Sequence, residues 1–264
     1  PPRSTLFPYT TLFRSQQQVV SLLQNAIEKD RIAQAYIFHG SDGVGKLMTA
    51  LYFGMAVNCL SSGEFKPCGV CISCHKFLNF EHPDFLYLFP TTNLNMNTDG
   101  EIRSQEALKQ YEGYLKNKRE TPWSEYFFTG SIEIRKESIS YLIKKLEFSI
   151  NEGNYRVVIV ENADMMNTQT ANAFLKTLEE PPARTIIILI TERLPMILPT
   201  IISRCQPVYF KPLSQKVVQE MLFDQFQIGS IVAKGVARIC GGNFKTAIRD
   251  RKSTRLNSSH RIRY

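Results

Sequence analysis

The sequence predicts an α/β domain built on a parallel sheet flanked by helices, followed by a small all-helical domain. Residues 157–160 and 185–190 are continuous runs of apolar, largely β-branched side chains, which are typical of strands covered on both faces. A glycine-rich turn at residues 40–46 stands between an apolar segment and a helical one. Residues 213–250 show only helical patterns. Strands alternating with helices and then helices alone indicate this two-part architecture.

The composition is that of a soluble globular protein. Of 264 residues, 43% are hydrophobic and 21% are charged, which argues against wholesale disorder and suggests one or two domains. No apolar stretch approaches the roughly 18 residues of a membrane span. The N-terminus lacks the apolar run and cleavage site of a secretory signal. We therefore expect a cytoplasmic protein with no membrane partner.

The two ends of the chain carry nearly all of its net charge of +8. Residues 1–15 and 251–264 hold seven basic residues and no acid, which leaves residues 16–250 near neutral at +1. Neither end has a helical or strand period, and both resemble translated adapter or cloning sequence. We expect them to be non-native flanks. The alternative is a pair of basic arms that grip nucleic acid.

The first half of the chain begins with an amphipathic helix. In residues 16–31 the apolar side chains fall at positions i, i+3, i+4, i+7 and i+8. Residues 35–38 are a short apolar strand, and residues 48–60 are predicted to be helical. The pattern then becomes less regular, with a polar loop at 91–100 and a charged, partly helical stretch at 101–118.

The second half of the chain is more regular. Residues 135–150 carry the apolar spacing of an amphipathic helix, and residues 168–179 form a helix that a proline pair ends. Residues 208–210 are a further short strand. We therefore place the α/β domain at residues 16–211, with a cysteine-rich insertion at 59–74, and a helical lid domain at 212–250.

The glycine-rich turn matches the G-x-x-x-x-G-K pattern of a phosphate-binding P-loop and reads Gly40-Ser41-Asp42-Gly43-Val44-Gly45-Lys46. Small residues let backbone N–H groups close around phosphates, and Lys46 would reach the outer ones. The next residue should be Ser or Thr to hold magnesium, but it is Leu47, which offers no oxygen, and Thr49 comes too late. The alternative to nucleotide binding is a loop kept only as a tight turn.

A second nucleotide motif is also altered. A P-loop ATPase needs an acid that orders the magnesium shell and a residue that activates water. The strand at 157–160 ends in Glu161, which could replace the metal-proximal acid, and Asn162, which cannot accept a proton. The alternative is that Asp164 supplies the carboxylate. Leu47 and Asn162 together predict that the fold was kept and the hydrolysis lost.

Four cysteines predict a metal site. Cys59, Cys68, Cys71 and Cys74 lie within sixteen residues, and four thiolates can close a tetrahedral zinc shell with no open position. Such a site is structural, and its binding free energy, on the order of 10 kcal/mol, can fold a loop with little core of its own. Disulfides are the rival interpretation, which a reducing compartment disfavours. His75 is expected at the surface.

The two remaining cysteines, Cys205 and Cys240, are isolated in the sequence. We interpret them as small buried hydrophobic residues.

Taken in order, these segments resemble one family, the AAA+ clamp-loader subunits of bacterial DNA polymerase III, with the delta-prime type matched better than the gamma/tau type. The resemblance covers nearly all of residues 16–250. Besides the P-loop and the cysteines it rests on four segments: Ala35-Tyr36-Ile37-Phe38, Asn172-Ala173-Phe174-Leu175-Lys176-Thr177-Leu178-Glu179-Glu180-Pro181-Pro182, Thr191-Glu192 and Leu198-Pro199-Thr200-Ile201-Ile202-Ser203-Arg204-Cys205.

The resemblance implies roles for the matching positions. The four cysteines would be zinc ligands, and Thr191 would be the sensor that contacts the γ-phosphate. Arg204 would be an arginine finger that reaches the ATP site of a neighbouring subunit. Lys245 lies near the second sensor. The degenerate nucleotide site would comprise Gly40, Gly43, Val44, Gly45, Lys46, Leu47, Glu161 and Thr191.

The departures from the pattern favour the delta-prime type. Gamma-type members keep Thr after the P-loop Lys and Asp-Glu on the second strand, where this chain has Leu47 and Glu161-Asn162. The resemblance then implies a stator within the polymerase holoenzyme that can hold ATP without hydrolysing it. Its partners would be gamma/tau and delta subunits, the sliding clamp and primed DNA. The family's helical collar domain has no match here, so we expect a truncated gene fragment.

Three rival functions stay open on the sequence alone. An ATP-hydrolysing gamma/tau-type subunit is the first. A small-molecule P-loop kinase is the second, although it would need the magnesium hydroxyl that Leu47 lacks. A stand-alone zinc-dependent DNA-binding module is the third, and the ordered motifs downstream of the cysteines argue against it.

Overall fold

The structure is a computed structural model. The residues that it describes are 13, 15–63, 66–97, 100–123 and 125–249. The two flanks expected to be non-native lie outside this described part except for Phe13 and Ser15. That expectation therefore stays a prediction.

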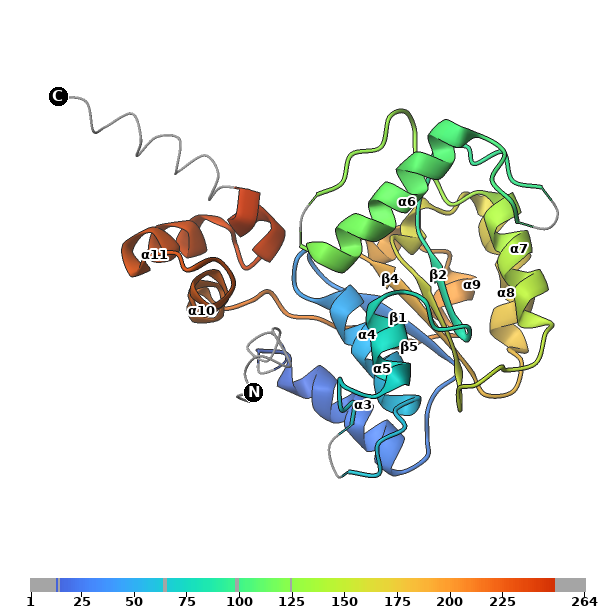
Figure 1. The fold of residues 1–264 in the computed structure, drawn as a ribbon, viewed down its shortest axis with the longest axis horizontal. Coiled ribbons are helices and arrows are strands. Elements are labelled where there is room, and N and C mark those ends of the chain that lie inside the picture. Colours follow the sequence, from blue (N-terminus) through green and yellow to red (C-terminus); the bar gives the residue numbers. More distant parts are fainter. Residues whose placement is uncertain (1–12, 14, 64–65, 98–99, 124, 250–264) are drawn as a thin grey trace.

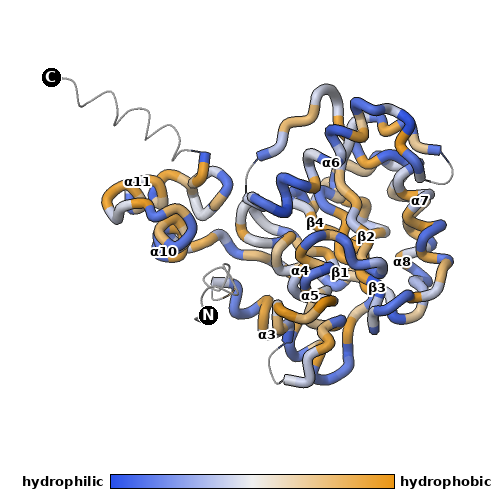
Figure 2. The backbone as a smooth tube through the Cα atoms, in the orientation of Figure 1, coloured by the Kyte–Doolittle hydropathy of each residue, from blue (hydrophilic) through white to orange (hydrophobic). Residues whose placement is uncertain are grey.

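A five-stranded parallel sheet forms the centre of the molecule, in the order β2-β3-β4-β1-β5 (Figure 1). Every residue of β3 and β4 is buried, as their continuous apolar runs predict. Strands near the centre of the sheet are predominantly hydrophobic (Figure 2). The strands are β1 (Ala35–His39), β2 (Phe85–Leu88), β3 (Arg156–Val160), β4 (Thr185–Thr191) and β5 (Gln206–Tyr209).

Helices cover both faces of the sheet. Alternate strand residues point to opposite sides, so the apolar side chains of the strands form a hydrophobic cluster on each face. Phe38, Ile159 and Ile188 pack into one hydrophobic cluster, whereas Ile37 and Val160 pack into the other. The first cluster includes residues of α3 (Gln17–Glu28) and α4 (Lys46–Val57). The second includes residues of α7 (Lys136–Leu146), α8 (Thr168–Glu179) and α9 (Pro199–Ile202).

Two features between the cysteines and β3 extend or correct the sequence interpretation. The edge strand β2, which was not expected, pairs with β3, and the partly helical stretch becomes α6 (Gln105–Glu120). The helix predicted over residues 135–150 ends at Leu146 instead. The guanidinium of Arg156 donates to the carbonyl oxygens of Leu146 and Ser149 where the helix ends. The buried carboxylate of Asp84 then holds the following turn, because it accepts hydrogen bonds from the backbone N–H groups of residues 151–153.

The chain beyond the sheet is helical, as predicted. It contains α10 (Gln215–Phe226), α11 (Ser230–Ile239) and a short helix at residues 244–249, and it lies beside the sheet rather than on it (Figure 1). The backbone N–H of Phe244 donates to the P-loop carbonyl of Gly43 at 3.2 Å. The rings of Phe244 and Trp123 meet edge to face, with centroids 5.3 Å apart. Among the described helices none has the length and apolarity needed to cross a membrane.

Candidate nucleotide cleft and cysteine site

The predicted P-loop joins β1 to α4, at the carboxyl edge of the sheet. Gly45 immediately precedes α4 and has a φ of 96°. Lys46 is buried, and its ammonium donates to the carbonyl oxygens of Gly40 at 2.8 Å and Ser41 at 2.5 Å. Burial lowers the pKa of Lys46, and the charges of Glu192 and Asp42 oppose that effect. The loop therefore has the P-loop shape, with its lysine bonded to the loop's own carbonyls.

Two glycines are required by close approach of other segments. A Cβ added to Gly40 would lie 2.3 Å from the carbonyl oxygen of Phe210. A Cβ added to Gly43, whose φ is +65°, would lie 2.3 Å from Oδ1 of Asn243. These positions need glycine because backbone and lid residues fill the space that a side chain would occupy.

Glu161 directly follows β3, and both of its carboxylate oxygens accept hydrogen bonds from residues of the same chain. Its carboxylate accepts hydrogen bonds from the hydroxyl of Tyr114 at 2.6 Å, from the Nζ of Lys118 at 2.7 Å and from the hydroxyl of Tyr87. Burial acts to raise the pKa of Glu161, but the charges of Lys118 and Lys245 and the hydrogen bonds from Lys118 and Tyr114 lower it to about 2. This carboxylate is ionised and already neutralised by Lys118.

The alternative acid, Asp164, is held elsewhere. It accepts from the hydroxyl of Thr191 at 2.7 Å and from Nε of Arg193 at 2.9 Å, and it does not line the P-loop cleft. The interpretation in which Asp164 supplies a magnesium ligand therefore gains no geometric support. Asn162 does line the cleft, in a left-handed conformation with φ of 51°.

The cleft beside the P-loop is narrow and charged. Its cavity of about 40 Å³ is lined by three lysines and three acids: Lys46, Lys118, Lys245, Asp42, Glu161 and Glu192. Lys245 belongs to the lid, and its Nζ lies 2.8 Å from Oδ1 of Asp42. Burial acts to lower the pKa of Lys245, but Asp42 and Glu161 raise it, so this ammonium is held in its charged form.

The structure brings together most, but not all, of the predicted nucleotide residues. Gly43, Gly45, Lys46, Leu47 and Glu161 line the cleft. The others do not line it: Gly40, Val44 and Thr191.

Arg204 lies outside this cleft, in the short segment between α9 and β5. Its guanidinium pairs with Glu179 at 2.6 Å and donates to the carbonyl of Thr200 at 2.8 Å. The residue is exposed. Arg204 thus forms an ion pair with a residue of the same chain. This pair leaves the side chain at the surface, where a neighbouring protein can reach it.

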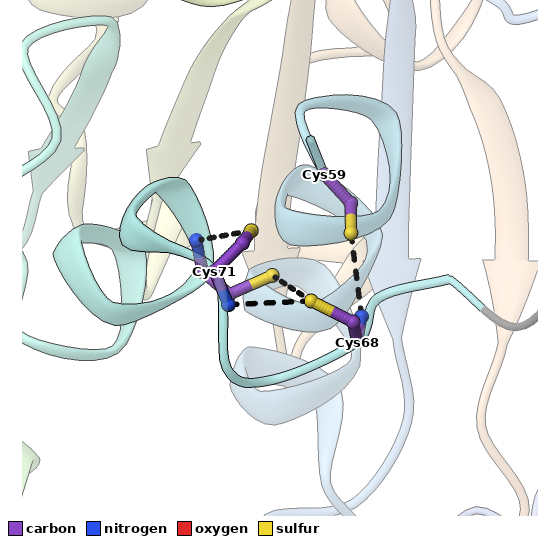
Figure 3. Close-up of side chains that lie close together, drawn as sticks. Cys59, Cys68 and Cys71 are labelled. Atoms are coloured by element: carbon purple, nitrogen blue, oxygen red, sulfur yellow. Dashed lines mark hydrogen bonds between the residues drawn. The ribbon is translucent and has the colours of Figure 1, made fainter. Parts of the chain in front are cut away.

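The four predicted zinc ligands come together between the end of α4 and the start of α5 (Ile72–Leu78). Their sulfur atoms all lie within 4.8 Å of one another, and Figure 3 shows the side chains of Cys59, Cys68 and Cys71 lying close together. A tetrahedral zinc site with bonds of about 2.3 Å places its sulfurs about 3.8 Å apart. The Sγ atoms of Cys68 and Cys74 are 4.0 Å apart. The donor set and its spacing fit zinc.

Backbone amides donate to sulfur atoms of this cluster. The N–H of Cys68 points to Sγ of Cys59 at 3.3 Å, and the N–H of Cys71 points to Sγ of Cys68 at 3.3 Å. Burial acts to raise the pKa of Cys71, but hydrogen bonds from backbone and neighbouring thiols lower it to about 6. His75 is exposed and is not part of the cluster, as expected.

Cys205 and Cys240 are both buried and lie apart from the cluster. This agrees with their interpretation as small hydrophobic residues. Burial raises the pKa of Cys205 to about 12, which keeps its thiol protonated.

Sequence reasoning missed the contribution of α6 to the cleft. Lys118 and Trp123 line it, together with Pro122. One signal was available: Tyr114 and Lys118 are four residues apart and therefore share a face of the helix. Nothing in the sequence, however, joins that face to Glu161, which is 43 residues away from Lys118.

Comparison with known proteins agrees with the motifs. The family described as "DNA polymerase III, delta subunit" matches residues 15–214. The delta' subunit of DNA polymerase III from Bacillus subtilis (strain 168) is 33% identical over 210 residues, which are 80% of this chain and 52% of that protein. The tau subunit from the same organism is 30% identical over 207 residues, which are 78% of this chain and 30% of that protein.

Solved structures show the same fold at low identity. The Thermotoga maritima RuvB Holliday junction branch migration motor aligns with a TM-score of 0.51 at 11% identity, over 89% of this chain and 59% of that one. The chain spans about half the length of its delta' relative. With its parallel sheet, its P-loop and a family match over residues 15–214, the chain belongs to the DNA polymerase III delta-subunit family.

Proposed function

We propose that this protein is a delta-prime-type subunit of the DNA polymerase III clamp loader, a stator that does not hydrolyse ATP and that supplies an arginine finger to a neighbouring ATPase subunit. In this role it takes part in sliding-clamp loading during DNA replication in the cytoplasm. Its partners are gamma/tau and delta subunits, and through the assembled complex the sliding clamp and primed DNA. The domain division at residues 16–211 and 212–250 belongs to the same proposal.

One observation carries the non-hydrolysing part of the proposal. The Glu161 carboxylate, the acid placed to order a magnesium shell, is saturated by Lys118, Tyr114 and Tyr87. The adjacent P-loop position, Leu47, offers no oxygen. Without a metal ligand on either side, the developing charge of phosphoryl transfer has no divalent cation to neutralise it.

The arginine finger is the active contribution of the subunit. Arg204 is exposed and lies away from the chain's own cleft, so its guanidinium is accessible to another protein, where its proposed target is a phosphate group. Its present partner, Glu179, holds the guanidinium at 2.6 Å. Docking of a neighbour would exchange that carboxylate for the γ-phosphate of the neighbour's ATP. A bidentate guanidinium suits both groups.

Zinc at Cys59, Cys68, Cys71 and Cys74 is the structural cofactor of the proposal. It would hold the segment between α4 and α5 in place, and all four positions are filled by protein ligands. Such a closed shell supplies no catalytic chemistry.

The alternative function is an ATP-hydrolysing gamma/tau-type subunit. The 30% identity to the tau subunit of Bacillus subtilis favours it. Leu47 and the Lys118–Glu161 pair argue against it.

The test replaces Arg204 by Ala in the full-length protein and assembles it with gamma-type and delta subunits. A finger in trans is worth about 10³–10⁵ in rate, so turnover at the one neighbouring site should fall by about 10³-fold or more. Arg119→Ala is the matched control, because Arg119 forms a surface ion pair with Glu81 at 3.2 Å. Unchanged DNA-stimulated ATPase activity and clamp loading with Arg204→Ala would refute the proposal.

A further inference from the structure

The carboxyl end of α6 enters the nucleotide cleft. Lys118 lines the cleft with Lys46 and Leu47 of the P-loop. The side chains of Lys118 and Glu161 are only 5% and 8% exposed, and their charged atoms are 2.7 Å apart. Lys118 stands out on α6, where the other buried residues are Ala107 and Tyr114. A charge is rarely buried this deeply unless it has a dedicated partner.

We propose that the Lys118 ammonium occupies the place of a divalent cation in this P-loop cleft, so that the cleft excludes Mg²⁺-bound phosphates even when the missing P-loop hydroxyl is restored. This inference deepens the proposed function and rests on its non-hydrolysing part. It names Lys118 as a residue that sets the ligand specificity of the cleft.

The chemistry follows from the contacts of Glu161. A Mg²⁺ ion binds oxygen ligands in a tight octahedral shell and takes carboxylates directly or through its waters. Here one oxygen of Glu161 accepts from Lys118, and the other accepts from Tyr114 and Tyr87. A divalent ion would have to displace a buried ammonium from its counter-ion and would then lie beside that positive charge. Both steps oppose its binding.

The available space agrees with this assignment. The cavity of about 40 Å³ has room for very few water molecules, whereas pockets for small-molecule ligands typically measure about 300–1,000 Å³. Trp123 of the segment after α6 lines the same cavity and packs on Phe244 of the lid. The α6 end thus supplies both a positive charge and bulk at the place where a metal and its phosphates would lie.

The experiment compares Leu47→Thr, Lys118→Ala and the double variant in the full-length protein. Binding of Mg²⁺-pyrophosphate and of Mg²⁺-ATP is measured by titration calorimetry, pyrophosphate being included because it has no base to meet Trp123. We expect the double variant to bind Mg²⁺-pyrophosphate at least tenfold more tightly than Leu47→Thr alone. Lys116→Ala combined with Leu47→Thr is the matched control, because Lys116 is on the same helix and its side chain is 70% exposed.

Two results overturn the inference. One is Mg²⁺-pyrophosphate binding by Leu47→Thr alone as tight as by the double variant. The other is a double variant that is folded by circular dichroism and gains no binding. If Lys118→Ala does not fold, Lys118→Gln replaces it, because the amide keeps a donor for Glu161 and removes the charge. The same two results then decide.

The unaltered protein gives a further readout. Millimolar MgCl2 with pyrophosphate should leave its thermal midpoint unchanged, and a rise would contradict the inference. Adding Glu161→Gln to the double variant should abolish the gained Mg²⁺ response. The binding tests concern Lys118 and the cleft of this chain, whereas the Arg204 assay measures turnover by a neighbouring subunit. Either result can therefore be negative while the other is positive.

Discussion

Asp84 and Glu161 are buried carboxylates that the fold keeps ionised by different means. Asp84 accepts from three backbone N–H groups, those of Asn151, Glu152 and Gly153, at 2.7–2.9 Å. Burial acts to raise the pKa of Asp84, but these hydrogen bonds lower it below its usual value. Glu161 depends on one ammonium and two tyrosine hydroxyls instead. The Asp84 carboxylate holds the turn at residues 151–153, and the Glu161 carboxylate lines the cleft.

Because of these two carboxylates, we expect the free energy of unfolding to decrease at acid pH. The folded-state pKa of each is lower than its unfolded value, so each stabilises the fold above the unfolded pKa of about 4 and loses that contribution as pH falls. For Glu161, whose folded pKa is about 2, the loss runs between about pH 5 and pH 2 and is on the order of 3 kcal/mol.

Urea unfolding at a series of pH values measures this loss directly. The free energy of unfolding should decrease steadily below about pH 5. In Glu161→Gln, which has no charge to lose, the decrease should be smaller. An identical pH dependence in the variant and in the unaltered protein would contradict the role given to Glu161.

The cysteine cluster carries a second prediction at this scale. Cys74→Ser should release zinc and lower the free energy of unfolding by several kcal/mol, because a closed four-sulfur shell contributes on the order of 10 kcal/mol to folding. Cys240→Ser is the matched control, since Cys240 is buried but lies outside the cluster. Metal analysis by mass spectrometry should find one zinc per chain in the control and little in Cys74→Ser. Equal zinc in both variants would disprove the site.

At the scale of elements, the sequence predicts best where one simple pattern covers a whole helix or strand. α3 and α8 have clear apolar periods, and β3 and β4 are unbroken apolar runs. The sequence does not predict β2, because this edge strand has one buried and three partly buried residues and therefore a weak hydrophobic pattern. Two of the three buried residues of α6 are Tyr114 and Lys118, so its buried face does not look apolar.

Docking of the lid on the P-loop predicts opposite effects for two glycine substitutions. Gly43→Ala would force a side chain against Asn243 at a positive φ and should destabilise by about 1–3 kcal/mol. Gly235 is exposed on α11 with nothing within 4 Å of an added Cβ, so Gly235→Ala should stabilise the fold by about 1 kcal/mol. Thermal and urea unfolding measure both variants. Equal effects at the two positions would show that the loop and the lid do not meet as described.

At the scale of the whole molecule, the ordered motifs predict the fold and the family, whereas the state of the cleft depends on contacts between distant segments. Leu47 and Asn162 are visible in the sequence as departures from an active site. The saturation of Glu161 is not visible, because Tyr87, Tyr114 and Lys118 reach it from β2 and α6. The exposed pair between Arg204 and Glu179 likewise forms only once α8 and α9 pack together.

The central claim is that this protein keeps a P-loop scaffold without turning over ATP. The most direct measurement is Mg²⁺-dependent phosphate release by the purified full-length protein, compared with its Lys46→Ala variant. We expect the two to release phosphate at the same background rate, because Leu47 offers no oxygen to a metal and Glu161 is already paired with Lys118. Turnover above that background, lost in Lys46→Ala, would contradict the account.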